Sequence, residues 1–191
     1  DIDRAALSPT MRVSYDIFRF RNEQRVTNHP FRFHDYDVSH FGGPHQDIPN
    51  LLINRHRVDD ASDAEAYVAR IAGTDKVMDQ TIEFMREQQA NGIRLPRFSY
   101  QLIIDDARKA VQGAPFGGNG DNDIYADFKK KVAKLNGKDK LTADAEKALQ
   151  EKLKPAYSRF IAAAEEIGKA AKTDHGAGTL RINGGTYTGH A

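Results

Sequence analysis

The apolar side chains from residue 62 to residue 172 recur at the spacing of α-helices, and this periodicity limits the possible folds more than any other feature. One stretch shows it most clearly, because its apolar residues occupy the first, fourth, eighth and eleventh positions: Tyr125, Phe128, Val132 and Leu135. We find no stretch that predicts a β-sheet and no internal repeat. The sequence therefore predicts an all-α fold.

Residues that start and stop helices divide this pattern into about six helices with short connections. Ser8 followed by Pro9 is typical of a helix start, because the serine caps free N–H groups and the proline lacks one. Gly73 is expected to end one helix and Thr74 to cap the next. We predict six helices, at residues 8–28, 62–73, 74–91, 98–111, 125–135 and 142–172, and a further short one at 48–56. The helix at 142–172 is the longest, and Pro155 should kink it because a backbone hydrogen bond is lost there.

Three segments lack the helical pattern. Residues 30–46 are expected to form an ordered irregular loop with one short strand, and residues 113–123 a Gly-rich loop between helices. The latter is close to a calcium-binding repeat, but such repeats act in stacked copies and only one copy is present. Residues 176–191 contain five Gly and no helical period. We therefore expect a helical region at 1–175 and a Gly-rich tail at 176–191.

Composition excludes several classes of function. The 28 Lys and Arg residues nearly balance the 27 Asp and Glu residues, so the chain has no strong positive field and nucleic acid is not an expected partner. No run of about 18 consecutive apolar residues is present, and none of the segments is expected to cross a membrane. The chain has no Cys, which rules out disulfides, thiolate zinc sites and cysteine nucleophiles.

A group of histidines in the first third of the chain invites a test for metal binding. Two histidines can share a helix face when they lie four positions apart, as in a His-Glu-x-x-His zinc helix. The gaps between successive members of this group are 5, 6, 5 and 11 positions, for His29, His34, His40, His45 and His56. No His-Glu pair occurs in the sequence. We therefore predict structural, hydrogen-bonded histidines and no metal ligands in this chain.

Charged clusters are also assigned to solvated helix surface. Asp105 and Asp106 are adjacent on a predicted helix, so their side chains point about 100° apart and cannot act as a catalytic pair. The run Lys129, Lys130 and Lys131 has acidic neighbours that dilute its charge, and solvated helix surface is the expected role.

Residues 31–43 are too aromatic for a free loop and too polar for a core. Loops of this kind, when packed on helices, often line clefts. Two interpretations stay open, contact with a ligand and an ordered structural loop. If the segment contacts a ligand, the candidate residues in and beside it are His34, Tyr36, His40 and His45.

An ordered series of short segments resembles one bacterial family. The series includes Leu7-Ser8-Pro9 and Phe31-Arg32-Phe33-His34-Asp35-Tyr36, and continues through residues 48–57, 64–71, 79–80, 92–96, 114–116 and 153–157. Together these segments are similar to the N-terminal half of the family known as domain of unknown function 885. The likeness runs from about residue 7 to residue 173, and it is the order of the segments that makes it specific.

The resemblance implies a helical zinc metallopeptidase of the gluzincin type. Members of that family resemble one another in a distal His-Glu-Ala-x-Pro-Gly-His-His segment, in which the His would bind zinc and the Glu would activate water. That segment is absent from this sequence, so no catalytic residue and no zinc ligand is carried over. Zinc is expected only in a C-terminal part beyond this chain. The resemblance also implies a bacterial, exported protein, periplasmic or associated with the cell envelope, and in some cases a lipoprotein.

Two hypotheses for function follow. In the first, the chain is the N-terminal part of a zinc-metallopeptidase-like protein, it helps to form the substrate channel, and alone it is inactive. Its partners would then be a peptide substrate and the catalytic half. In the second, the chain is a self-contained, non-catalytic helical module that binds another molecule.

Overall fold

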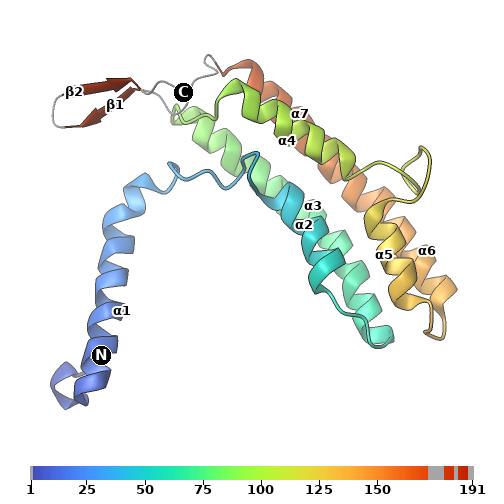
Figure 1. The fold of residues 1–191 in the computed structure, drawn as a ribbon, viewed down its shortest axis with the longest axis horizontal. Helices are drawn as coiled ribbons and strands as arrows, with labels where there is room; N and C mark the ends of the chain where they lie inside the picture. The colour runs from blue at the N-terminus through green and yellow to red at the C-terminus, as the bar shows by residue number, and fades with distance from the viewer. Residues whose placement is uncertain (1, 172–178, 183–184, 189–191) are drawn as a thin grey trace. The chain divides into compact units, whose positions relative to one another are not determined.

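The computed structural model describes residues 2–171, 179–182 and 185–188, and Figure 1 shows its helices and strands. The chain divides into two compact units, residues Asp1–Asp35 and Tyr36–Ala191, which are described separately. Residues 1–175, predicted as one helical region, thus span both units. None of the described helices is both long and apolar enough to cross a lipid bilayer.

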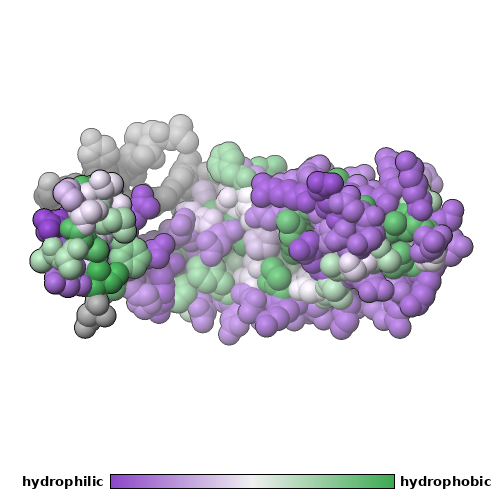
Figure 2. Space-filling model, turned by 90° about the horizontal axis from the view of Figure 1, so that it is seen from below, coloured by the Kyte–Doolittle hydropathy of each residue, from purple (hydrophilic) through white to green (hydrophobic). Residues whose placement is uncertain are grey.

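The first unit is built around one helix, α1 (Pro9–Asn28), between two short 3₁₀ turns, η1 (Arg4–Ala6) and η2 (His29–Phe31). Its predicted start is confirmed, because the Ser8 hydroxyl oxygen accepts a hydrogen bond from the Met11 N–H at 3.3 Å. No residue of α1 is buried. Figure 2 shows apolar side chains among the polar ones on this unit, and the exposed large ones on the helix are Met11, Val13, Ile17, Phe18, Phe20 and Val26.

The second unit contains the other six α-helices of the described residues and two π-turns. In chain order these are α2 (Pro44–Asn50), η3 (Leu51–Arg55), α3 (Ala61–Ala90), α4 (Arg97–Lys109), α5 (Asp123–Val132), α6 (Lys138–Ala148), η4 (Leu149–Leu153) and α7 (Lys154–Lys169). Figure 1 shows α4 running alongside α7, and α3 also packs on α7. The predicted all-α class is confirmed, including a long helical run at residues 138–169.

A short hairpin is the one β-element in the described part of the chain. Strands β1 (Thr179–Ile182) and β2 (Gly185–Thr188) are antiparallel, with Thr179 opposite Thr188. The expectation of no sheet is wrong for these eight positions. An Asn-Gly dipeptide stands between the strands in the sequence, and this is a strong short-range signal for a hairpin.

Helix α3 is one continuous helix, although two were predicted. Gly73 and Thr74 lie inside it and do not break it. The helix buries a single face on both sides of this point, including Ile71 and Met78, and that packing outweighs the cost of about 1 kcal/mol for an internal glycine. The Thr74 side chain is buried, and its hydroxyl lies 3.5 Å from the Arg70 carbonyl oxygen one turn earlier.

The long C-terminal run handles Pro155 by a local change of helix type. The run begins at Lys138 and ends at Lys169, and its irregular part is the π-turn η4, which directly precedes the turn that holds Pro155. In η4 the Lys154 N–H bonds to the Leu149 carbonyl five residues earlier. The irregularity near Pro155 takes the form of a π-turn in the five residues that precede Lys154, and the kink itself stays a prediction.

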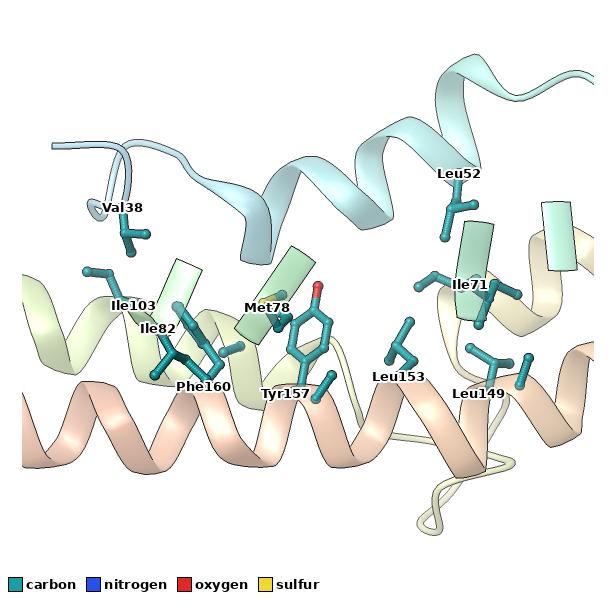
Figure 3. Packing of buried hydrophobic residues seen from close by; sticks show 14 of the residues in the cluster. Val38, Leu52, Ile71, Met78, Ile82, Ile103, Leu149, Leu153, Tyr157 and Phe160 are labelled. Carbon is teal, nitrogen blue, oxygen red and sulfur yellow. The ribbon is translucent and has the colours of Figure 1, made fainter. Parts of the chain in front are cut away.

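The core of the second unit lies between α3, α4, α7 and the segment that runs from Val38 to Leu52. Figure 3 shows Leu149, Leu153, Tyr157 and Phe160 pointing the same way from the C-terminal run, toward side chains that include Leu52 and Met78. All six of these side chains are fully buried. Two aromatic residues, Tyr67 of α3 and Phe128 of α5, extend the core toward α5, with ring centroids 4.9 Å apart. The hydrophilic residues cover most of the visible outer face of this unit (Figure 2).

Candidate functional site

The histidine-rich segment packs on the helices of the second unit as a strap, which we define as residues 36–50. It consists of an irregular stretch followed by α2, and it packs on α3 and α4. Val38 anchors the irregular stretch in the core at 4% exposure. The predicted short strand is reduced to a single bridge, in which Ser39 and Gly42 exchange backbone hydrogen bonds of 2.8 and 3.3 Å.

The first two candidate residues, His34 and Tyr36, belong to different units. His34 belongs to the first unit, is exposed, and sets its ring edge-on to Phe31 with centroids 5.6 Å apart. Tyr36 begins the second unit, is half-buried, and its hydroxyl donates a hydrogen bond to the Arg94 carbonyl at 3.3 Å. The structure places Tyr36 as an anchor of the strap, and His34 outside it.

His40 joins the strap to the start of α4 and forms an aromatic patch with two neighbours. Its Nδ1 lies 3.0 Å from the Ser99 hydroxyl, within hydrogen-bond distance. Its ring centroid lies 4.0 Å from that of Phe41 and 5.4 Å from that of Phe98. Phe41 is 87% exposed and Phe98 is 46% exposed, so the patch presents ring faces to the surroundings.

His45 is a core residue, although it lies in a short helix. The side chain is 1% exposed and its ring stacks on Phe160, with centroids 5.5 Å apart and planes at 19°. Neither ring nitrogen has a hydrogen-bond partner in the protein, whereas the backbone carbonyl of His45 accepts a bond from the Tyr157 hydroxyl at 2.8 Å. Burial lowers the pKa of His45, and the carboxylates of Asp106 and Asp47 oppose this only in part.

Asp106 connects α4 to the strap, which the sequence interpretation missed. Its carboxylate accepts hydrogen bonds from the Gln46 side-chain amide at 2.9 Å and from the Lys109 ammonium at 3.0 Å. The Lys109 bond is the main cause that lowers the pKa of Asp106, so this carboxyl is charged near neutrality. Asp105, by contrast, pairs on the surface with Arg108 at 3.7 Å, as predicted for solvated helix surface.

A second polar cluster closes the end of η3, and it corrects the assignment of Lys131 to solvated surface. The Lys131 ammonium donates to the carbonyls of Leu52 and Ile53 at 2.8 and 2.9 Å, and pairs with Asp127 at 2.7 Å. Asp127 also accepts a bond from the Tyr67 hydroxyl at 3.0 Å. Burial and this carboxylate raise the pKa of the Tyr67 hydroxyl far above its usual value. The helical phase distinguishes Lys131 from Lys130, because Lys131 lies seven positions after Ile124 and three after Phe128, on the buried face of α5. Only the fold, however, brings the carbonyls of η3 to it.

His56 lies beside this cluster as a satisfied structural histidine. The Arg70 guanidinium donates to its Nδ1 at 2.5 Å, which places the ring proton on Nε2, 3.1 Å from the Asp63 carbonyl oxygen. Burial, followed by the charge of Arg70, lowers the pKa of His56. This geometry is the one expected for a histidine that fixes an irregular segment.

The Gly-rich loop is ordered by a buried asparagine. The Asn122 side-chain amide donates to the carbonyls of Ala110 and Gln112 at 3.0 and 2.9 Å, and its oxygen accepts from the Ile124 N–H at 3.1 Å. Gly113 has a φ of +81°, and a Cβ there would lie 2.8 Å from the Asn122 backbone nitrogen. The loop therefore serves as a tight N-terminal cap for α5.

The described residues do not fit a zinc ion. Within the described ranges, no three His, Cys, Asp or Glu side chains come close enough together to hold a metal. The strap histidines are directed to separate partners, a serine hydroxyl for His40 and a phenylalanine ring for His45. What the site offers instead is an exposed aromatic patch, formed by His40 and Phe41 of the strap and Phe98 of α4.

Comparison with known proteins places the chain in a family and shows its fold in a larger protein. Residues 1–186 match the model of a family described as "Bacterial protein of unknown function (DUF885)". The fold is similar to that in the crystal structure of "the putative lipoprotein from Colwellia psychrerythraea", with a TM-score of 0.65 and 20% sequence identity. That match covers 71% of this chain and 23% of the Colwellia chain, so this chain spans less than a quarter of that protein. No curated protein matches the sequence.

Proposed function

The chain belongs to DUF885, a family of bacterial proteins of unknown function, and from this premise we propose that it is the N-terminal helical part of a larger zinc-metallopeptidase-like protein. The observation that carries the proposal is the matched share of the Colwellia chain, 23%, against 71% of this one. A helical region that matches so small a part of a larger protein is expected to pack against the rest of that protein and to line one side of its substrate channel.

In this proposal the strap faces a channel that admits peptide substrates. The aromatic patch of His40, Phe41 and Phe98 supports this role, since exposed rings can stack on apolar or aromatic peptide side chains. Tyr36 and His45 hold the strap in place, because their partners are backbone groups or core side chains.

Catalysis is assigned to a part of the protein outside this chain. A zinc peptidase needs about three protein ligands and an activated water. The described residues supply no such ligand set, so zinc and the catalytic groups would come from the partner half. We also propose that the protein is exported to the periplasm or the cell envelope, which the name of the Colwellia relative supports.

Hydrolysis and binding can be measured separately on the purified 191-residue chain. We expect no cleavage of fluorescence-quenched peptides with added zinc, and binding of labelled aromatic peptides by fluorescence anisotropy. The Phe41→Ala variant should weaken binding about three- to tenfold, the value of one aromatic contact. Arg57→Ala is the control, since that side chain is 84% exposed and lies outside the strap. Zinc-dependent cleavage that a chelator stops would contradict the division of labour.

A self-contained binding module is the second candidate. The observation that favours it is the closed core of the second unit, in which Tyr67, Phe128, Tyr157 and Phe160 are all fully buried. Such a module should unfold cooperatively as an isolated chain and bind little of a dye that reports exposed apolar surface. A part of a larger protein should bind the dye strongly and aggregate, because α1 exposes its apolar residues.

A further inference from the structure

His45 combines deep burial with the absence of polar partners for its ring. Of the histidines that the structure describes, it is the one whose two ring nitrogens are both buried and without hydrogen bonds. Phe160 covers one face of the ring, with centroids 5.5 Å apart. Gly43 lies on the Nδ1 side, where a Cβ would be 3.3 Å from this nitrogen.

The strap is held around this ring by contacts that leave the imidazole itself unbonded. The Tyr157 hydroxyl binds the His45 carbonyl at 2.8 Å, and Gln46 binds Asp106 at 2.9 Å. Closer to the N-terminus, His40 meets Ser99 at 3.0 Å and Tyr36 meets Arg94 at 3.3 Å. Each of these is a single hydrogen bond, worth about 0.5–1.5 kcal/mol net. The closed strap is thus held by the buried side chain of Val38 and by a few single hydrogen bonds, and it encloses a neutral ring.

None of the charged groups around the His45 ring forms a direct hydrogen bond that would stabilise its protonated form. On α4, Asp106 is already engaged by Gln46 and Lys109. On α2, Asp47 is exposed. On α7, Tyr157 is neutral and its hydroxyl is used by the His45 carbonyl. A cation enclosed here would lose its hydration without gaining a direct partner, and that cost drives a buried imidazole to stay neutral or become exposed.

We propose that His45 is a pH-sensitive latch: protonation of its imidazole releases the strap, residues 36–50, from α4 and α7 while the helices beneath stay folded. Opening hydrates the ring and uncovers Phe160 and the adjoining core. His40 and Phe41 move with the strap whereas Phe98 stays on α4, so acid would change the surface that this unit presents. The inference rests on the packing of His45 and does not depend on the proposed function.

The direction of the pH effect follows from linkage. The ring in the closed strap resists protonation, and the ring in the open strap takes up a proton at the ordinary pKa of about 6.5. The closed state is therefore fully favoured above pH 6.5 and weakens as the pH falls below it. Because one proton is taken up on opening, the ratio of open to closed strap should rise by up to about tenfold per pH unit.

Hydrogen exchange on the full 191-residue chain tests the latch. Protection of the strap amides is measured between pH 7.5 and 5.0 and corrected for the intrinsic effect of pH on exchange. We expect strap protection to fall by about tenfold per pH unit below pH 6.5, and the amides around Ile71 in α3 to keep their protection. A strap that keeps its protection at pH 5.0, or one that opens only together with α3, would overturn the proposal.

Variants isolate the contribution of His45. His45→Phe keeps an aromatic ring against Phe160 and cannot ionise, so its strap protection should not depend on pH in this range. His40→Asn, a change of the other strap histidine, should keep the pH dependence of the wild type. If His45→Phe does not fold, the Cε1–H resonance of His45 in the wild type decides. Titration near pH 6.5 with unchanged strap resonances would show a ring that ionises while closed, and would refute the latch.

Discussion

Replacing Lys131 by methionine is expected to destabilise the second unit by about 2–3 kcal/mol. Methionine keeps most of the apolar stem of the side chain and removes the ammonium group. The change therefore deletes two hydrogen bonds to the carbonyls of Leu52 and Ile53 and the ion pair with Asp127. It also removes a cation 5.2 Å from the centre of the Tyr67 ring.

The size of the stability loss in Lys131→Met depends on how far water can replace the lost contacts. An exposed ion pair contributes about 0–1 kcal/mol, and breaking a buried one costs about 3–5 kcal/mol. The side chains of Lys131 and Asp127 are 20% and 19% exposed, which places this pair nearer the buried limit. The carbonyls of Leu52 and Ile53 also lose a charged donor. A hydrogen bond to a charged group contributes about 1.5–3 kcal/mol when water does not replace it. Partial rehydration brings the net loss to the expected 2–3 kcal/mol.

Urea unfolding followed by circular dichroism measures this loss as a lower midpoint with an unchanged slope. Lys130→Met is the matched control, because Lys130 is the preceding residue of the same helix and is exposed. It should stay within about 0.5 kcal/mol of the wild type. Asp127→Asn completes a double-mutant cycle, and a coupling of at least about 1 kcal/mol with Lys131→Met is expected. A Lys131→Met variant as stable as Lys130→Met would refute the reasoning.

Two glycines and one asparagine give further predictions from the same unfolding assay. Gly73→Ala should stabilise the chain by about 0.5–1 kcal/mol, because a Cβ at Gly73 meets nothing within 4 Å and alanine favours the helix. Gly168→Ala should instead destabilise by about 1–3 kcal/mol, since its Cβ would lie 3.0 Å from Cβ of Tyr100, which is buried; equal effects at the two glycines would contradict this. Asn122→Ala should cost about 2–4 kcal/mol, because a helix cap is lost and two carbonyls lose their donor. Asn122→Asp, which keeps the capping oxygen, should recover part of that loss, and no recovery would mean that the cap contributes little.

The helices were predictable where local signals and packing agree. Ser8 and Pro9 mark the start of α1 whether or not the helix has a partner, because capping is a property of the first turn. Gly73 misled the prediction because its local preference for a break competes with a face of α3 that packs on both sides of it. The hairpin has no helical period, and the sequence feature that predicts it is the Asn183-Gly184 dipeptide between the two strands.

The site was less predictable than the fold. That His56 is a satisfied structural histidine followed from the spacing of the histidines, and its bonds to Arg70 and Asp63 confirm this. The different environments of His40 and His45 could not be predicted from the sequence. They depend on which residues of α4 and α7 each ring contacts. Whether any of the four candidate residues contacts a substrate stays a prediction.

The π-turn η4 corrects the phase of the long C-terminal run. Its buried residues follow one another in four successive steps of four, at Leu141, Ala145, Leu149, Leu153 and Tyr157. In a regular α-helix each such step overshoots a full turn by about 40°, so the buried stripe would wind about 160° away from the core. The additional residue of a π-turn takes back about 100° of this rotation. Shortening the run by one residue at this point would therefore turn Tyr157 and Phe160 toward solvent whenever Leu141 and Ala145 stayed in the core.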